Sequence, residues 1–187
     1  MEFFTILTEN QRDELRREGK VEYLYNTEID KEAHEWLKIT MIRRGFSKPA
    51  ESILPFTVFP ISQINQTWPY VRLEHMEPKM VRVDFEIPSL ALASKVMFFD
   101  STKWTKAVHG EPCYESIAEE KEMAIRYTTM TPNDRRTYRF ESWSRCIPTK
   151  SLKPENEVTL AFCWTIHEAW VKKETEYKPR IITCPID

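Results

Sequence analysis

Alternating apolar and polar residues mark the clearest strand of the chain. The apolar positions are Val81, Val83, Phe85 and Ile87, and the charged positions between them are Arg82, Asp84 and Glu86. A period of two residues places the apolar side chains on one face of a sheet and the charged ones on the other. We therefore predict a strand over 81–87, ended by Pro88, whose apolar face shares a core with Phe162 and Trp164.

Shorter apolar runs predict further strands. They cover Phe3 to Leu7, Val21 to Tyr25, Thr57 to Ile61, Val96 to Phe99 and Val158 to Ile166, and residues 170–183 can supply an edge. The 158–166 run is rich in β-forming residues and has little polar alternation, which is typical of a buried central strand.

Helix signals lie between these runs. Thr8 can cap a helix together with Gln11 in a capping box, and Gly19 stands where a left-handed C-cap is expected. Further helices are predicted to start at Asp30, at Asp100 or Ser101, at Tyr114 and at Thr131-Pro132. With no internal repeat and no linker, the pattern predicts one α+β domain over residues 1–187. It should have a mixed or mainly antiparallel sheet and several flanking helices.

Composition narrows the chemistry. The chain has 187 residues, of which 30% are charged, yet the formal net charge is only -2 and gives no global attraction to nucleic acid or acidic lipid. Its three glycines are too far apart for a Walker loop, a Rossmann fingerprint or a G-x-S-x-G elbow. No apolar run approaches the length of a membrane span, and the first residues lack a secretory pattern. We predict a cytoplasmic protein that does not cross a membrane.

Cysteine and histidine spacing predicts no metal site. The four cysteines form no C-x-x-C pair, and no two histidines have the H-E-x-x-H spacing, so free thiols are expected. Cys163 lies in the most apolar strand, where burial raises a thiol pKa. Cys113 lies near a helix start and is the better nucleophile candidate, with an unreactive thiol as the alternative.

Two surface features suggest partners. Trp68 lies in a proline-rich loop with Tyr70 and Arg72, where it can anchor a protein partner or fold back on its own domain. Arg135, Tyr138 and Arg139 share a helix with further arginines, a combination that can grip phosphate and stack bases. The acidic residues nearby favour an ion-paired helix surface over nucleic-acid binding.

Several short motifs in order resemble an uncharacterised family of bacterial and phage proteins, known only as a domain of unknown function. The family opens with a Trp-Thr-Ile-Gln-like strand and closes with a Val-Gln-Ala-Thr-Phe-Trp-like strand. The matching positions are Phe4-Thr5-Ile6-Leu7 with Gly19, Ala33 with Trp36 and Leu37, Pro69-Tyr70-Val71-Arg72, Asp100 with Trp104, Ser142-Trp143, and Ala161-Phe162-Cys163-Trp164. The resemblance implies a mixed α+β fold and supplies no activity.

A second layout is similar to ADP-ribosyltransferase-like folds, in which an opening β–α–Gly unit holds NAD and a late glutamate contacts the nicotinamide ribose. Glu157 would be the catalytic carboxylate, Tyr23 or Tyr25 would stack on the nicotinamide, and Thr5 would lie at the NAD-binding opening strand. The alternative for Glu157 is a solvated turn. Two function classes therefore remain open: a non-enzymatic binding protein with a protein partner and no cofactor, which we favour, and an NAD-dependent enzyme.

Overall fold

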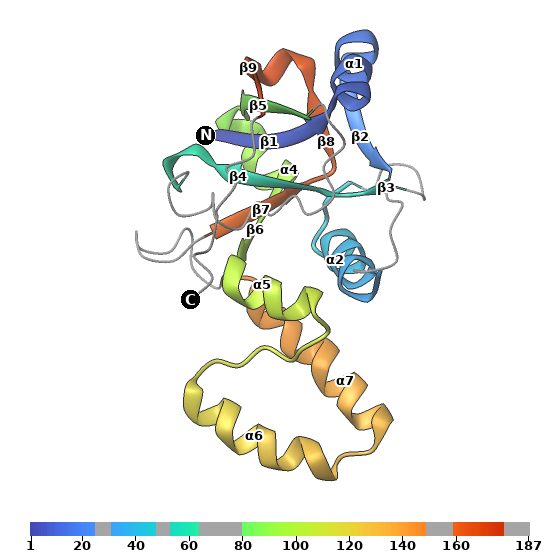
Figure 1. The fold of residues 1–187 in the computed structure, drawn as a ribbon, viewed down its shortest axis with the longest axis vertical. Coiled ribbons are helices and arrows are strands. Elements are labelled where there is room, and N and C mark those ends of the chain that lie inside the picture. The colour runs from blue at the N-terminus through green and yellow to red at the C-terminus, as the bar shows by residue number, and fades with distance from the viewer. Residues whose placement is uncertain (25–30, 48–52, 64–79, 149–158, 178–187) are drawn as a thin grey trace, which may run out of the picture.

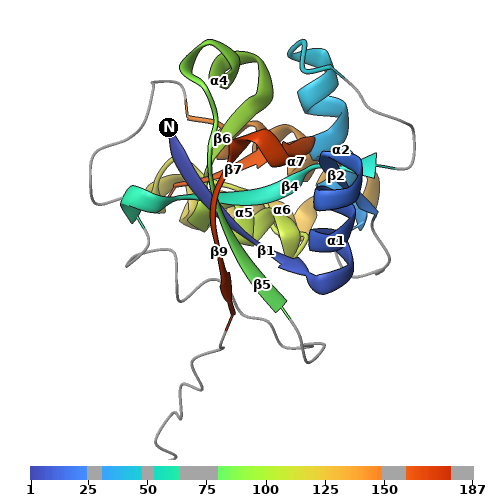
Figure 2. The same ribbon diagram turned by 90° about the horizontal axis from the view of Figure 1, so that it is seen from above.

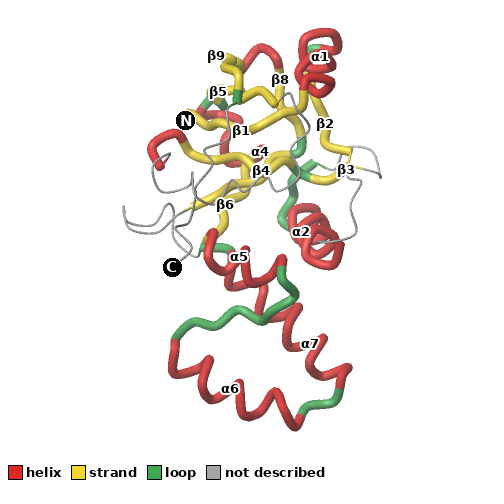
Figure 3. Tube along the Cα trace, viewed as in Figure 1, coloured by secondary structure: helices red, strands yellow, loops and turns green. Residues whose placement is uncertain are grey.

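The computed structural model describes residues 1–24, 31–47, 53–63, 80–148 and 159–177. Within these ranges the chain forms a six-stranded sheet and a three-stranded sheet, surrounded by helices (Figures 1 and 3). All strand pairs are antiparallel, and the larger sheet has the order β6-β7-β4-β1-β5-β9. The fold is therefore α+β, as the sequence predicts. The strands of this sheet are β1 (Glu2–Thr8), β4 (Phe56–Pro60), β5 (Met80–Glu86), β6 (Val96–Asp100), β7 (Thr159–Cys163) and β9 (Val171–Glu176).

The smaller sheet fills a split in the larger one. Two neighbouring strands, β7 and β4, separate beyond Trp164 and Pro55 and continue as β8 (Thr165–His167) and β3 (Ile53–Leu54). The strand β2 (Lys20–Leu24) pairs with both continuations, giving the order β3-β2-β8. Proline lacks the backbone N–H that a ladder needs, so Pro55 is a natural point for the break. Seen from above, the strands fan out with the twist usual for such sheets (Figure 2).

The helix signals at Thr8, Asp100 and Thr131 are confirmed, whereas the helix predicted from Tyr114 begins at Ile117 and is capped by Ser116. Thr8 accepts a hydrogen bond from the Gln11 backbone while the Gln11 side chain accepts one from Thr8, and Gly19 has φ 71°. Asp100 and Thr131 also cap their helices. The helices are α1 (Glu9–Glu18), α2 (Lys31–Arg43), α4 (Ser89–Lys95), α5 (Ser101–Val108), α6 (Ile117–Thr129) and α7 (Pro132–Ser142), with short 3-10 helices η1 (Ile61–Gln63), η3 (Trp143–Cys146) and η4 (Glu168–Trp170).

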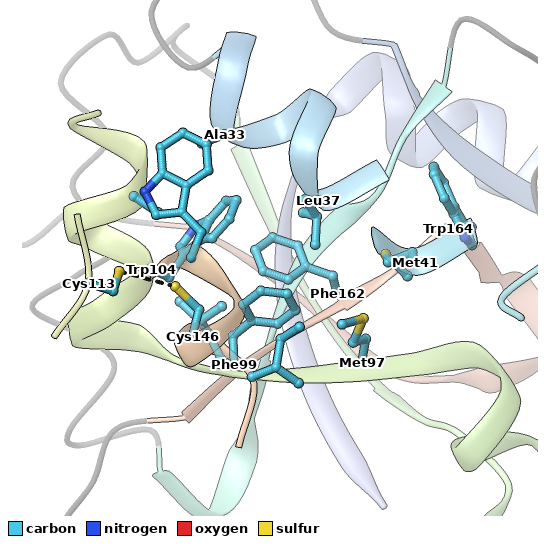
Figure 4. Packing of buried hydrophobic residues seen from close by; sticks show 14 residues of the cluster. Ala33, Leu37, Met41, Met97, Phe99, Trp104, Cys113, Cys146, Phe162 and Trp164 are labelled. Atoms are coloured by element: carbon cyan, nitrogen blue, oxygen red, sulfur yellow. Dashed lines mark hydrogen bonds between the residues drawn. The ribbon is translucent and has the colours of Figure 1, made fainter. Parts of the chain in front are cut away.

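Apolar side chains cover both faces of the larger sheet. One face holds Val81, Val83, Phe85 and Ile87 together with Phe56, Val58, Ala161 and Cys163. The other packs against α2, α5 and η3 and contains Phe99, Trp104, Trp143, Phe162 and Trp164 (Figure 4).

The prediction that Phe162 and Trp164 share a core with the 81–87 strand is therefore wrong. Phe162 pairs with Thr57, whereas Phe85 pairs with Phe3, and these two pairs project from opposite faces. All five residues of β7 are buried, so its apolar run carries no signal of which residue faces which side. Because β7 is buried on both faces, it lacks the alternation of apolar and polar residues from which the orientation of β5 could be predicted.

Helices α6 and α7 extend beyond the sheet as an arm below α5 (Figure 1). Met123 is the buried residue of α6, while Ile117 and Ile125 are 73% and 74% exposed. The arm meets the rest of the protein through η3, through the connection after α5 and through ion pairs from α7 to Glu32 of α2. We call this junction, Gly110–Cys113 against Arg139–Cys146, the neck.

Candidate functional site

A pocket of about 220 Å³ lies beside the split between β7 and β4. It is smaller than the sites that enclose whole drug-sized ligands, so its size suits a small ligand or one group of a larger one. Two strands, the end of α4 and the residues after α2 contribute to it. The lining residues are Lys20, Glu22, Ser47, Ser94, Lys95, Trp164, Thr165 and His167.

Strand alternation places the polar residues of the pocket. Val21 on β2 and Ile166 on β8 are buried in the core, so the residues on either side of each point the other way. Lys20 pairs with His167 and Glu22 pairs with Thr165 in the antiparallel register. Four pocket residues therefore come from two pairs of one ladder, on either side of the buried Val21–Ile166 pair.

Trp164 lies at the break between β7 and β8. It is 6% exposed, lines the pocket and packs in the aromatic core on the other side. Its indole Nε1 is buried and has no hydrogen-bond partner in the structure as described. A buried donor without an acceptor costs free energy of folding, and here that donor belongs to a residue that lines the pocket.

The charges around the pocket leave it positive. The Lys20 ammonium donates to Glu22 Oε1 at 2.7 Å. Lys95 makes no ion pair with residues in the described ranges. Burial, followed by the charges of Lys95 and Lys20, lowers the pKa of His167 below its ordinary value, while Glu22 opposes the shift. Two ammonium groups against one carboxylate, with His167 neutral at pH 7, give a net positive pocket.

These residues were not among the site residues predicted from the sequence. The pocket brings together positions 20, 47, 94 and 164, which are far apart in the chain and share no motif. The one available signal was the polar alternation of Lys20 and Glu22 around Val21, opposite Thr165 and His167 around Ile166.

The site residues predicted from the sequence are absent from the pocket lining or lie outside the described residues. Thr5 is 3% exposed, and its hydroxyl donates to the Thr57 carbonyl at 2.9 Å, away from the pocket lining. Tyr23 lies on β2, where it pairs with Leu54. Five candidates lie outside the described residues: Tyr25, Trp68, Tyr70, Arg72 and Glu157.

The arginine-rich helix is an ion-paired surface. Arg139 and Arg136 both contact Glu32 of α2. Arg135 donates to the Thr128 carbonyl at 2.9 Å, and the Tyr138 hydroxyl lies 3.4 Å from Glu119. These partners occupy the groups that a nucleic-acid interface would need free, which favours the ion-paired interpretation.

Within the described ranges no three histidine, cysteine or acidic side chains gather as a metal site. Burial raises the pKa of Cys163 to about 12, as expected for a thiol in the apolar strand. None of the described helices has the length and apolar character needed to cross a membrane. Comparison of the chain with protein-family models, with curated proteins and with solved structures gave no match, so the resemblance to the bacterial and phage family stays a prediction.

Proposed function

We propose that the chain is a binding protein without catalytic activity, and that its pocket takes one carboxylate from an acidic segment of a protein partner. The observation that carries this proposal is that two lysines and three hydroxyl-bearing residues line one small pocket. Lys20 and Lys95 supply the charge, and Ser47, Ser94 and Thr165 supply donors.

The charge of the pocket favours a carboxylate over a doubly charged phosphate. Glu22 already cancels one of the two ammonium charges, so one positive charge is left for the ligand. Charge-assisted hydrogen bonds to a carboxylate are stronger than neutral ones. A partner segment also fits the prediction that Trp68, Tyr70 and Arg72 form a partner-binding loop.

The test is calorimetric titration with a short glutamate-rich peptide and with acetate, at low salt. Lys95→Gln should weaken peptide binding about tenfold or more, since a hydrogen bond to a charged group contributes about 1.5–3 kcal/mol. Lys121→Gln is the matched control, because Lys121 is an exposed lysine on α6. Equal peptide affinity in both variants, or no binding by the wild-type protein, would contradict the proposal.

The enzymatic alternative keeps one supporting observation. β2, the strand on which Tyr23 was expected to hold NAD, contributes Lys20 and Glu22 to the pocket. In this alternative Glu157 is the catalytic carboxylate. Glu157→Gln should then abolish nicotinamide release from NAD without changing the melting temperature. Absence of NAD binding and of nicotinamide release in the wild-type protein would exclude it.

A further inference from the structure

Two thiols meet at the neck of the arm. Cys113 lies between α5 and α6, and Cys146 is the last residue of η3. Their Sγ atoms are 3.5 Å apart, although the residues are separated by 33 positions in the chain (Figure 4). Both thiols are free and buried.

Polar contacts fix the two segments that carry the thiols. The backbone N–H of Cys113 donates to Ser142 Oγ at 2.9 Å, and Arg145 Nη1 donates to the Cys113 carbonyl at 2.8 Å. The Trp143 indole N–H donates to the Glu111 carbonyl at 2.7 Å. Because backbone groups on one side and three side chains on the other are involved, the approach of the sulfur atoms does not depend on a single rotamer.

We propose that Cys113 and Cys146 form an oxidation site, a dithiol that closes to a disulfide when the protein meets a hydroperoxide such as hydrogen peroxide. A disulfide needs an S–S distance of about 2.0 Å, so the sulfur atoms must approach from their present separation. The site lies outside the pocket and is independent of the proposed carboxylate binding.

The two thiols differ in the role each can take. The hydrogen bond from Cys146, together with the charges of Lys103 and Lys106, lowers the pKa of the Cys113 thiol. The same hydrogen bond and burial raise the pKa of Cys146. A thiolate is the nucleophilic form, so Cys113 attacks the oxidant and Cys146 resolves the product. Before this step Cys113 donates to the Lys103 carbonyl at 3.2 Å, a bond lost with the proton.

The reaction balances with one peroxide molecule. Cys113 Sγ attacks one peroxide oxygen, the O–O bond breaks, and the departing hydroxide takes up the thiol proton as water, which leaves a sulfenic acid. Cys146 Sγ then attacks Cys113 Sγ, the S–O bond breaks, and a second water leaves. Two thiols lose two electrons, and the peroxide gains them. Since both thiols are buried, the oxidant needs a local opening to reach them, which makes the reaction slower than that of an exposed thiol.

The disulfide would join the two ends of the arm covalently. Its loop contains α6 and α7, so a cut in either helix would leave the fragments connected. Cross-linking a loop of this length also restricts the unfolded chain, which predicts a higher melting temperature for the oxidised protein.

The test treats the folded wild-type protein with hydrogen peroxide, alkylates the remaining thiols in denaturant and identifies linked peptides by mass spectrometry. We expect a Cys113–Cys146 peptide pair that is lost on reduction, and a raised melting temperature. Cys146→Ser, which keeps the nucleophile, should accumulate a Cys113 sulfenic acid that dimedone traps, and Cys113→Ser should accumulate neither product. Full alkylation of Cys113 and Cys146 after peroxide treatment of the wild-type protein would overturn the proposal. So would a linked pair that forms only after unfolding.

Discussion

β7 and α6 both carry apolar residues, but they are held in opposite ways. Every residue of β7 is buried, because β6 and β4 flank it and a hydrophobic cluster covers each of its faces. On α6 two isoleucines, Ile117 and Ile125, are mostly exposed to solvent. The same type of side chain therefore contributes to stability in one region and very little in the other.

The difference lies in what fastens each region. Ion pairs between Arg145 and Glu119 and between Lys106 and Glu120, each 2.7 Å long, connect α6 to its surroundings. Both pairs are still partly open to solvent, and solvent-accessible pairs contribute about 0–1 kcal/mol each. The sheet instead depends on buried apolar area. We expect the arm to open locally at a lower free energy than the sheet.

Phe85→Ala should have the largest effect. Phe85 is fully buried and stacks on Phe3 with ring centroids 6.0 Å apart. Its removal should lower the free energy of unfolding by about 3–5 kcal/mol, because a cavity remains in a packed core. Denaturant unfolding measures the loss. A loss near that of a surface substitution would place β5 at the periphery of the core.

Ser142→Ala tests the neck. The Ser142 hydroxyl accepts from the buried N–H of Cys113, and its loss leaves that donor unpaired. We expect a loss of about 1–3 kcal/mol in the free energy of unfolding. Ser142 and Ser144 each also donate to the carbonyl three residues earlier, and Ser144 is exposed, so Ser144→Ala is the matched control. Equal losses of stability in the two variants would contradict the assignment of the neck as the junction that holds the arm to the rest of the protein.

Acidification should lower the free energy of unfolding through His167, which lies on β8 beside the pocket. An unfolded histidine takes up its proton near pH 6.5, whereas burial and the charges of Lys95 and Lys20 make the folded one do so at lower pH. The free energy of unfolding is therefore at its full value above about pH 6.5. It falls as the pH drops below about 6.5, because the unfolded chain then binds a proton that folded His167 does not. A bound carboxylate favours the protonated imidazole, so peptide affinity should rise as the pH falls towards the lowered pKa of folded His167. An NMR titration of His167 at its ordinary pKa would refute both expectations.

Ile125→Ser should have the smallest effect. Ile125 is 74% exposed, so the free energy of unfolding should change by less than about 0.5 kcal/mol. Met123→Ser on the same helix should cost clearly more, because Met123 is buried. Thermal unfolding of the two variants compares them directly. A large loss in Ile125→Ser would indicate that the outer face of α6 is covered in solution.

Local signals in the sequence predicted local structure well. The capping box at Thr8 and the alternation over 81–87 each depend on a few neighbouring residues, and both are confirmed. The helix α4 was not predicted, since Pro88 marks the end of β5 as well as the start of the helix, and no side chain caps it. Because Pro88 can end a strand or begin a helix, the neighbouring residues alone do not decide between the two.

The candidate site could not be predicted in the same way. Its residues come together only because β7 and β4 separate and β2 enters the gap. That arrangement depends on pairings such as Lys20 with His167, which join segments far apart in the chain. No window of neighbouring residues contains this information. The proximity of Cys113 and Cys146 was missed for the same reason.

The position of β2 also has a consequence for protein synthesis. β2 leaves the ribosome long before one of its two neighbours, β8, is made. Until then one edge of β2 has unpaired backbone groups, and such edges are where nascent chains associate wrongly. Lys20 and Glu22 on this strand are charged residues of the kind that discourage association. The lysine that we assign to the pocket would therefore protect the chain before the pocket exists.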